Sequence, residues 1–218
     1  WLVTWREIFG NTQNYQDGIW TELLNIIKAE HPHAGGKFLR IAGVSIDSGW
    51  NTELVYRFVN EINQECGYEL ARATKGSDEL RFSHDEIYNE PADFDMVSYK
   101  SVRRSLAETM GVKVYNIGAH KAHNEILRRV GLNLIEGCNQ DRYFFNEQSY
   151  GMYEDQMVSC RKLIDERSGV QREIYKLVSG KRKEAIDAEK NALHNAYALE
   201  IPSYTSEHWK QIENYLYH

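Results

Sequence analysis

Two groups of carboxylates in the 218-residue sequence have the spacing that metal-dependent hydrolysis requires. Asp47 directly follows the apolar segment 38–46 and precedes Ser48-Gly49, and Glu184 stands three residues before Asp187. Hard divalent cations prefer oxygen ligands. Two such ions about 3.5–4 Å apart would activate a water molecule and stabilise a leaving phosphate oxygen. These residue types therefore indicate hydrolysis of a phosphate ester.

Each carboxylate also has an ordinary structural explanation. An Asp after a strand can form a turn or cap a helix, and acidic residues in a first helical turn suit the helix dipole. The basic cluster Lys181-Arg182-Lys183, just before Glu184, suits phosphate groups but also suits a solvated helix start. Taken one at a time, these groups favour the structural explanation. Assigning these residues to a catalytic site therefore depends on their occurring together in one pattern.

A third group consists of His120, His123 and Glu125, near the start of an expected helix. Histidines three residues apart point to the same side of a helix and can share a metal ion such as zinc. Imidazole also suits manganese, although carboxylate and water suit it better. A polar helix start explains the same three residues, so both interpretations stay open.

The elements that must position these residues alternate along the chain. Apolar spacing predicts helices near residues 1–30, 52–62, 101–110, 120–130, 150–163 and 184–199, and strands near 38–46, 68–74, 112–117, 143–145 and 172–178. A linker is expected at 31–36 and a polar loop at 77–95. This alternation predicts an α/β fold with a largely parallel sheet, whose active groups collect beyond the carboxyl ends of strands.

Composition limits the functional classes. The hydrophobic fraction of 42% and charged fraction of 27% are those of a globular domain, and no apolar run approaches the ~20 residues of a membrane-spanning helix. The net charge of -6 counts against a tight, standing complex with duplex DNA but permits transient contact by an enzyme. The chain starts at Trp1 without Met or a leader pattern, which indicates a fragment. We expect a helical lead-in and linker over 1–36 and one domain over 37–218.

In their order along the chain, these segments resemble the nuclease domain of tailed-phage large terminase subunits of the lambda-like, GpA type. Residues 44–56 look like the family's apolar-I-D-S-G motif followed by T-x-x-V-Y, and 71–76 like its strand ending in K-G. Residues 114–118 resemble its V-G turn, and 143–145 with 152–157 its late strand and aromatic-Gln helix. Residues 180–187 match its G-x-R-N-E-A-L-D pattern. The resemblance covers about residues 38–200.

The resemblance implies a ribonuclease H-like fold, with a central mostly parallel or mixed sheet flanked by helices. It implies an endonuclease that hydrolyses phosphodiester bonds of concatemeric double-stranded viral DNA with two ions of Mg²⁺ or Mn²⁺. Asp47 and Asp187 would be metal ligands, and Glu184 a further ligand or an orienting neighbour. Lys75 and the cluster 181–183 would contact DNA. The terminase small subunit, the portal protein and the host cytoplasm follow from the family, without a membrane.

The sequence departs from the family pattern after the V-G turn. Where the family commonly has an acidic residue and, three positions on, a Lys, this chain has His120 and His123. If His120 replaces an acidic ligand, the site should prefer Mn²⁺ or another transition metal, with His123 as an accessory group. The alternatives are a docking module that binds portal or DNA and cleaves weakly, and a ribonuclease H-like resolvase or transposase relative.

Overall fold

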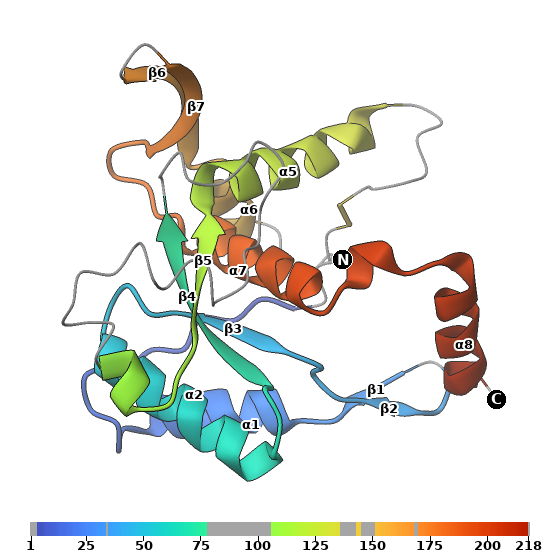
Figure 1. The fold of residues 1–218 in the computed structure, drawn as a ribbon. Helices are drawn as coiled ribbons and strands as arrows, with labels where there is room; N and C mark the ends of the chain where they lie inside the picture. The colour runs from blue at the N-terminus through green and yellow to red at the C-terminus, as the bar shows by residue number, and fades with distance from the viewer. Residues whose placement is uncertain are drawn as a thin grey trace. The chain divides into compact units, whose positions relative to one another are not determined.

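The structure is a computed structural model that describes residues 4–33, 35–77, 106–135, 143–144, 151–167 and 170–217 (Figure 1). The described residues form two compact units. Unit 1 takes those within Trp1–Glu7, Gly76–Ile87 and Ile117–Leu193, and unit 2 takes those within Ile8–Lys75, Tyr88–Asn116 and His194–His218. Each unit has its own hydrophobic core, so each is described by itself.

Unit 2 is built around the sheet β3 (Val44–Asp47), β4 (Ala71–Ser77) and β5 (Val114–Gly118), in the order β3-β4-β5. Strands β3 and β4 are parallel, with Asp47 opposite Thr74. Helices α1 (Gly18–Lys28) and α2 (Thr52–Cys66) supply most of the remaining core. The buried residues of α2 recur at helical spacing, so one face of the helix is apolar; they are Val55, Tyr56, Phe58, Val59 and Ile62.

The end of α2 is fixed to the start of β4 by backbone and side-chain bonds. Gly67 ends the helix with φ of 76°, a left-handed conformation that glycine adopts without a Cβ penalty. One turn earlier, the Asn63 amide donates to the Ala71 carbonyl and accepts from the Ala71 N–H, both at 2.8 Å. These contacts set where β4 begins beside β3.

Unit 1 combines α5 (Ala119–Gly131), η1 (Leu132–Leu134), α6 (Met152–Met157) and most of α7 (Glu184–Ala198) with an antiparallel hairpin. The hairpin consists of β6 (Cys160–Arg167) and β7 (Val170–Leu177), paired from Cys160 opposite Leu177 to Arg167 opposite Val170 (Figure 1). Its core contains Ile126, Tyr143, Tyr153, Met157, Ala185 and Ile186.

The rest of unit 2 is peripheral to its core. Strands β1 (His31–Pro32) and β2 (Phe38–Leu39) form an antiparallel pair, and η3 (Ile201–Ser203) and α8 (Ser206–Tyr217) follow α7.

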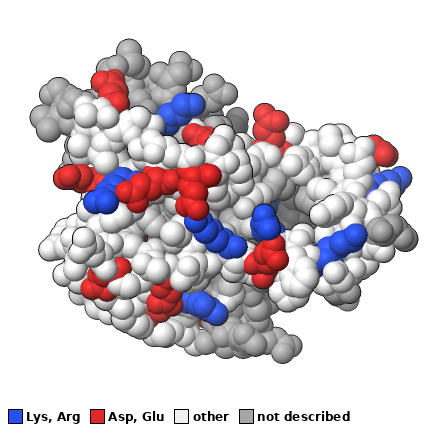
Figure 2. All heavy atoms as spheres, turned by 90° about the horizontal axis from the view of Figure 1, so that it is seen from below, with Lys and Arg blue, Asp and Glu red and all other residues white. Residues whose placement is uncertain are grey.

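On the face in Figure 2, acidic and basic side chains are interspersed, and an ion pair joins Lys28 of α1 to Glu65 of α2. The coloured residues of this face therefore present no continuous basic surface. None of the described helices has the length and apolar character needed to cross a bilayer.

The predicted α/β fold, with a parallel sheet flanked by helices, is confirmed and fits a ribonuclease H-like nuclease. One helix prediction was wrong. Residues 150–163 were expected as one helix, but α6 ends at Met157 and β6 begins at Cys160. The physical reason is that all eight residues of β6 pair with β7, and such tertiary pairing overrides local helical spacing.

Three smaller differences concern other predicted elements. In 1–30, the described helix is only Gly18–Lys28. The expected strand 38–46 is divided into β2 and β3. Residues 143–144 are not in a strand. The predicted loop at 77–95, apart from Ser77, and the start of the 101–110 helix lie outside the described residues.

Candidate active site

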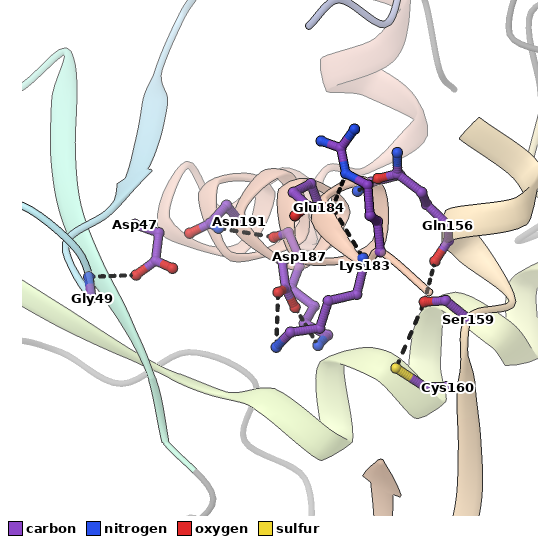
Figure 3. Close-up of polar contacts among 12 residues, drawn as sticks. Asp47, Gly49, Gln156, Ser159, Cys160, Lys183, Glu184, Asp187 and Asn191 are labelled. Atoms are coloured by element: carbon purple, nitrogen blue, oxygen red, sulfur yellow. Dashed lines mark hydrogen bonds and ion pairs between the residues drawn. The ribbon is translucent and has the colours of Figure 1, made fainter. Parts of the chain in front are cut away.

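Asp47 is exposed at the carboxyl end of β3 in unit 2. Its Oδ1 accepts a hydrogen bond from the Gly49 N–H at 2.8 Å, which forms a turn over Ser48 (Figure 3). A Cβ at position 49 would lie 3.1 Å from that oxygen, so a side chain there would crowd the carboxylate. The I-D-S-G sequence therefore holds one carboxylate oxygen in a turn at the end of a strand.

The turn that carries Asp47 is anchored to the neighbouring strand. Ser48 is fully buried, and both its N–H and its hydroxyl donate to the Thr74 carbonyl at 2.8 Å. The Thr52 hydroxyl donates to the Ser48 carbonyl at 2.8 Å. Because Thr74 is opposite Asp47 in the parallel register, Lys75 follows at the same edge of the sheet. Unit 2 thus brings one acidic and one basic predicted site residue to a single strand edge.

The last turns of α7 pack against β3 and β4 within unit 2. His194 is fully buried, and its Nδ1 lies 3.0 Å from the Ser45 hydroxyl, two residues before Asp47. Burial, reinforced by the positive charge of Arg72, lowers the pKa of His194 to about 4. At neutral pH this imidazole is therefore uncharged. His194 was not among the predicted site residues.

Asn195 is the second contact of α7 with the sheet. Its Oδ1 accepts from Arg72 Nη1 at 2.9 Å, and a Cβ at Gly43 would come within 2.6 Å of its Nδ2. Arg72 Nε also donates to Glu69 at 3.1 Å, and the Tyr115 hydroxyl donates to the same carboxylate at 2.8 Å. This hydrogen-bonded group connects α7, β4 and β5, and a side chain at position 43 would displace the Asn195 amide from it.

Asp187 is half-buried in the first turn of α7, in unit 1. Lys190 Nζ lies 2.8 Å from Oδ1 and Lys183 Nζ lies 3.0 Å from Oδ2 (Figure 3). Burial alone would raise the pKa of Asp187, but the two lysines outweigh it and the pKa is lowered. The carboxylate is therefore held in its ionised form, with a cation at each oxygen.

Glu184 begins α7 and is exposed. Its Oε2 accepts from the Lys183 N–H at 3.0 Å and from Arg182 Nε at 3.3 Å. Arg182 also forms an ion pair with Glu7 at 3.0 Å. The chain here brings Glu184 and Asp187 into one helical turn together with the predicted basic cluster. Two of that cluster's three side chains, Arg182 and Lys183, are already paired with carboxylates.

Gln156, a residue of α6, fixes the start of α7. It is buried, its Oε1 accepts from the Ala185 N–H at 3.0 Å, and its Nε2 donates to Glu7 at 3.3 Å. The first N–H groups of a helix have no partner within the helix, and Gln156 satisfies one of them across 29 residues of sequence. Gln156 therefore positions the turn that carries Glu184 and Asp187.

Replacing Gln156 with Met should destabilise the protein by about 1–3 kcal/mol, because the buried Ala185 N–H would lose its acceptor. Urea unfolding near neutral pH would measure the change. The matched control is Gln171→Met, since Gln171 is exposed on β7 and surface substitutions usually change stability by less than about 0.5 kcal/mol. Equal stabilities for the two variants would show that Gln156 does not hold the helix.

His120 and His123 lie in the first turns of α5, in unit 1, and have different environments. His120 Nδ1 accepts a hydrogen bond from the Tyr175 N–H of β7 at 3.1 Å. His123 is 1% exposed and stacks on the Tyr175 ring with centroids 3.8 Å apart. Neither of its ring nitrogens has a hydrogen-bond partner within the part of the chain that is described. The two predicted histidines therefore lie in different surroundings, one hydrogen-bonded to β7 and one stacked on a ring of β7.

Taken by unit, the predicted site residues form two sets. Unit 2 has Asp47 and Lys75 at a strand edge, and unit 1 has the first turns of α5 and α7. Within the described residues, no group of three or more His, Cys, Asp or Glu side chains is arranged to hold a metal ion. Lys190 was not among the predicted site residues, although its spacing of three from Asp187 places it on the same helix face.

Comparison with known proteins identifies a family. The family described as terminase large subunit gpA, endonuclease domain, matches residues 1–209 of the 218. Neither a curated protein nor a solved structure matches the chain. The match covers almost the whole sequence, including the turn at Asp47 and the start of α7. The chain therefore belongs to the family of terminase large subunit gpA endonuclease domains.

Proposed function

We propose that this endonuclease domain hydrolyses phosphodiester bonds of concatemeric double-stranded phage DNA by a two-metal mechanism. Asp47 and Asp187 would be the ligands of Mg²⁺ or Mn²⁺, with Glu184 as a further ligand or an orienting neighbour. The observation that carries the proposal is the family match together with the turn that holds Asp47 at a strand end. That Asp47 and Asp187 serve the same ions is part of the proposal and rests on the family.

The side chains present suit such ions by their donor chemistry. Asp47 and Asp187 provide carboxylate oxygens, which hard divalent cations prefer, and the buried nitrogens of His123 lack hydrogen-bond partners among the described residues. When bound, the ions would supply an activated water and would offset charge at the scissile phosphate. The contribution of the chain itself is to hold the Asp47 carboxylate in its turn and to keep the Asp187 carboxylate ionised between two lysines.

The lysines around Asp187 would act before and during the binding of the metal ion and DNA. Lys183 and Lys190 neutralise the carboxylate in the DNA-free protein. Their ammonium groups are single charges on flexible stems, so a divalent ion can take the place of at least one of them. A displaced Lys183 would then be available to a DNA phosphate.

DNA would be contacted by Lys75, Lys181, Arg182 and Lys183. Arg182 pairs with Glu7 and Glu184 in the free protein, whereas Lys181 is exposed and forms no ion pair with a described residue. Lys181 is therefore the most accessible phosphate contact of the cluster. In this role the domain would act in the host cytoplasm with the terminase small subunit and the portal protein, as the family implies.

Metal removal tests the proposal directly. The protein should nick and linearise supercoiled plasmid in Mn²⁺ or Mg²⁺, and EDTA should reduce cleavage to the level of a protein-free control. Restoring the ion in excess of EDTA should restore activity, because chelation leaves the fold in place. Cleavage that persists at full rate in EDTA would contradict a metal-dependent mechanism.

A docking module that cleaves weakly is the second candidate. It is favoured by the two lysines that already neutralise Asp187 and by the lack of a three-residue metal group within the described ranges. Such a module would bind DNA or portal equally well with and without divalent ions. Plasmid that is retarded on a gel but remains uncut in Mn²⁺ at high protein concentration would support docking.

A further inference from the structure

The two edges of the β6–β7 hairpin have different surroundings. The Tyr175 N–H of β7 donates to His120 Nδ1 of α5 at 3.1 Å, and Asn124 of α5 donates to Glu173 of β7 at 2.8 Å. The outer edge of β7 therefore lies against α5. The outer edge of the hairpin on the other side belongs to β6, and within the described part of the chain no further strand pairs with it.

The backbone groups on the outer edge of β6 follow from the alternation of an antiparallel pair, in which hydrogen-bonded and non-hydrogen-bonded pairs of residues take turns. The Val178 N–H donates to the Ser159 carbonyl at 2.9 Å, so the pair just before β6 is hydrogen-bonded. Tyr175, which is opposite Lys162, directs its N–H away from β6, so that pair is not. Both observations give the same alternation. The N–H and C=O groups that point outward are those of Cys160, Lys162, Ile164 and Glu166.

β6 lacks three devices that keep edge strands from pairing, namely shortness, a bulge and a proline. Its eight residues all pair with β7 in one unbroken register, whereas strands of about five or six residues are the most common. At its centre, Leu163 and Ile164 are 41% and 72% exposed. Charged residues stand on both sides of this centre, and such residues deter a strand of arbitrary sequence. A strand that adds here must therefore carry matching charges.

A second copy of β6 carries those charges in one register only. Side chains alternate between the two faces of a strand, so a twofold antiparallel pairing must place one residue opposite its own copy. Centring on Arg161, Lys162, Asp165 or Glu166 opposes that charge to itself, and centring on Ile164 opposes Arg161 to Arg167. Centring on Leu163 instead opposes Arg161 to Asp165 twice and includes no like-charge pair.

We propose that β6 pairs antiparallel with β6 of a second copy of this chain, centred on Leu163, and so forms a four-stranded sheet across a twofold axis. In this register the outward backbone groups of Lys162 bond those of Ile164 in the second copy. The exposed Arg161 faces Asp165 of the second copy. Opposite charges and apolar residues directly across two strands each stabilise the pairing. The inference concerns assembly and does not rest on the proposed function.

Disulfide formation in the full chain tests the register, with the three native cysteines replaced by serine. The two copies of position 163 form a non-hydrogen-bonded pair with Cα atoms about 4.5 Å apart, which a disulfide can bridge. The two copies of position 164 are diagonal neighbours about 7–8 Å apart, beyond that reach. Mild oxidation should therefore crosslink Leu163→Cys and leave Ile164→Cys largely monomeric. Random collision would give the reverse order, because Ile164 is the more exposed.

Charge variants test the same pairing without changing its apolar centre. In sedimentation experiments the wild type should form a weak, concentration-dependent dimer, because one pair of strands makes an interface of the small class, below about 1,200 Å². Arg161→Glu and Asp165→Arg should each weaken the dimer about 10-fold or more, since two cross-strand pairs change from attraction to repulsion. An equal mixture of the two variants should dimerise again, because each introduced charge then opposes one of the other sign.

The outcomes decide the inference separately from the nuclease, because none of the measurements includes cleavage. A wild-type chain that stays monomeric at every concentration overturns the dimer. Crosslinking of Ile164→Cys at least as fast as that of Leu163→Cys overturns the register. Association that the charge variants leave unchanged, or that their mixture does not restore, places the contact on another surface and also overturns the proposal. Should a cysteine variant not fold, the mixing experiment decides alone.

Discussion

Asp47→Asn should abolish metal-dependent cleavage of plasmid DNA while leaving the protein folded. The amide oxygen of the variant can still accept the Gly49 N–H, so the turn is kept and only the negative charge is lost. A catalytic metal contributes several kcal/mol to transition-state stabilisation, and each 1.36 kcal/mol is a factor of about ten in rate. We therefore expect the cleavage rate to fall by about 10³-fold or more, measured as conversion of supercoiled to nicked plasmid in Mn²⁺.

The matched control is Asp17→Asn, which removes a carboxylate that makes no capping bond to α1 in the same unit. It should cleave at the wild-type rate. A double variant, Asp47→Asn with Asp187→Asn, tests whether the two carboxylates act together. Residues that act as one unit give losses that do not multiply, so the double variant should lose no more than the single ones. Full activity of Asp47→Asn would remove the basis of the two-metal proposal.

The sequence predicted best where the determining contacts are local. The turn at Asp47 follows from Ser48-Gly49, because a side chain at position 49 would crowd the carboxylate. Helix α2 follows from the regular spacing of its apolar residues. The grouping of Glu184 with Asp187 follows from their separation by three residues on one helix. In each case the information lies within a few residues of the site.

Contacts between distant segments were not predictable from spacing. His194 binds Ser45 across 149 residues, and Gln156 binds the Ala185 N–H across 29. No local pattern distinguishes such a His or Gln from an exposed one. The hairpin shows the same limit in its backbone, because β6 is a strand only by virtue of its pairing with β7. Its exposed Leu163 and Ile164 could equally have belonged to a helix.

The two histidines of α5 are the same residue type at the start of one helix, but their surroundings differ. Their spacing of three predicts a shared direction, and both do lie in the first turns of the helix. The difference between them arises from β7, since the Tyr175 N–H binds one ring and the Tyr175 ring covers the other. The tautomer and the free lone pair of a histidine depend on such partners, so sequence alone can rank neither ring as a ligand.

Acidification should destabilise the protein through His194. Its pKa is about 4 in the folded protein and about 6.5 when unfolded. The folded-state pKa is depressed, so the contribution to stability is fully present above about pH 6.5 and is lost as the pH falls toward 4. Between about pH 7 and pH 5, the unfolded state gains a proton that the folded state excludes, which costs about 2 kcal/mol at 1.36 kcal/mol per unit.

Urea unfolding of wild type and His194→Asn at both pH values, in EDTA, would measure this effect. Asn retains a polar atom near the position of Nδ1 for Ser45, but it has no proton to gain in this range. The variant should therefore be less stable at about pH 7, because a buried ring is removed, yet its further loss at about pH 5 should be smaller than that of wild type by about 2 kcal/mol. His208→Asn is the control, since His208 is exposed on α8; it should keep the full wild-type pH dependence. Identical pH dependence in all three proteins would mean that His194 is protonated without cost, and hence that α7 does not hold it neutral against β3.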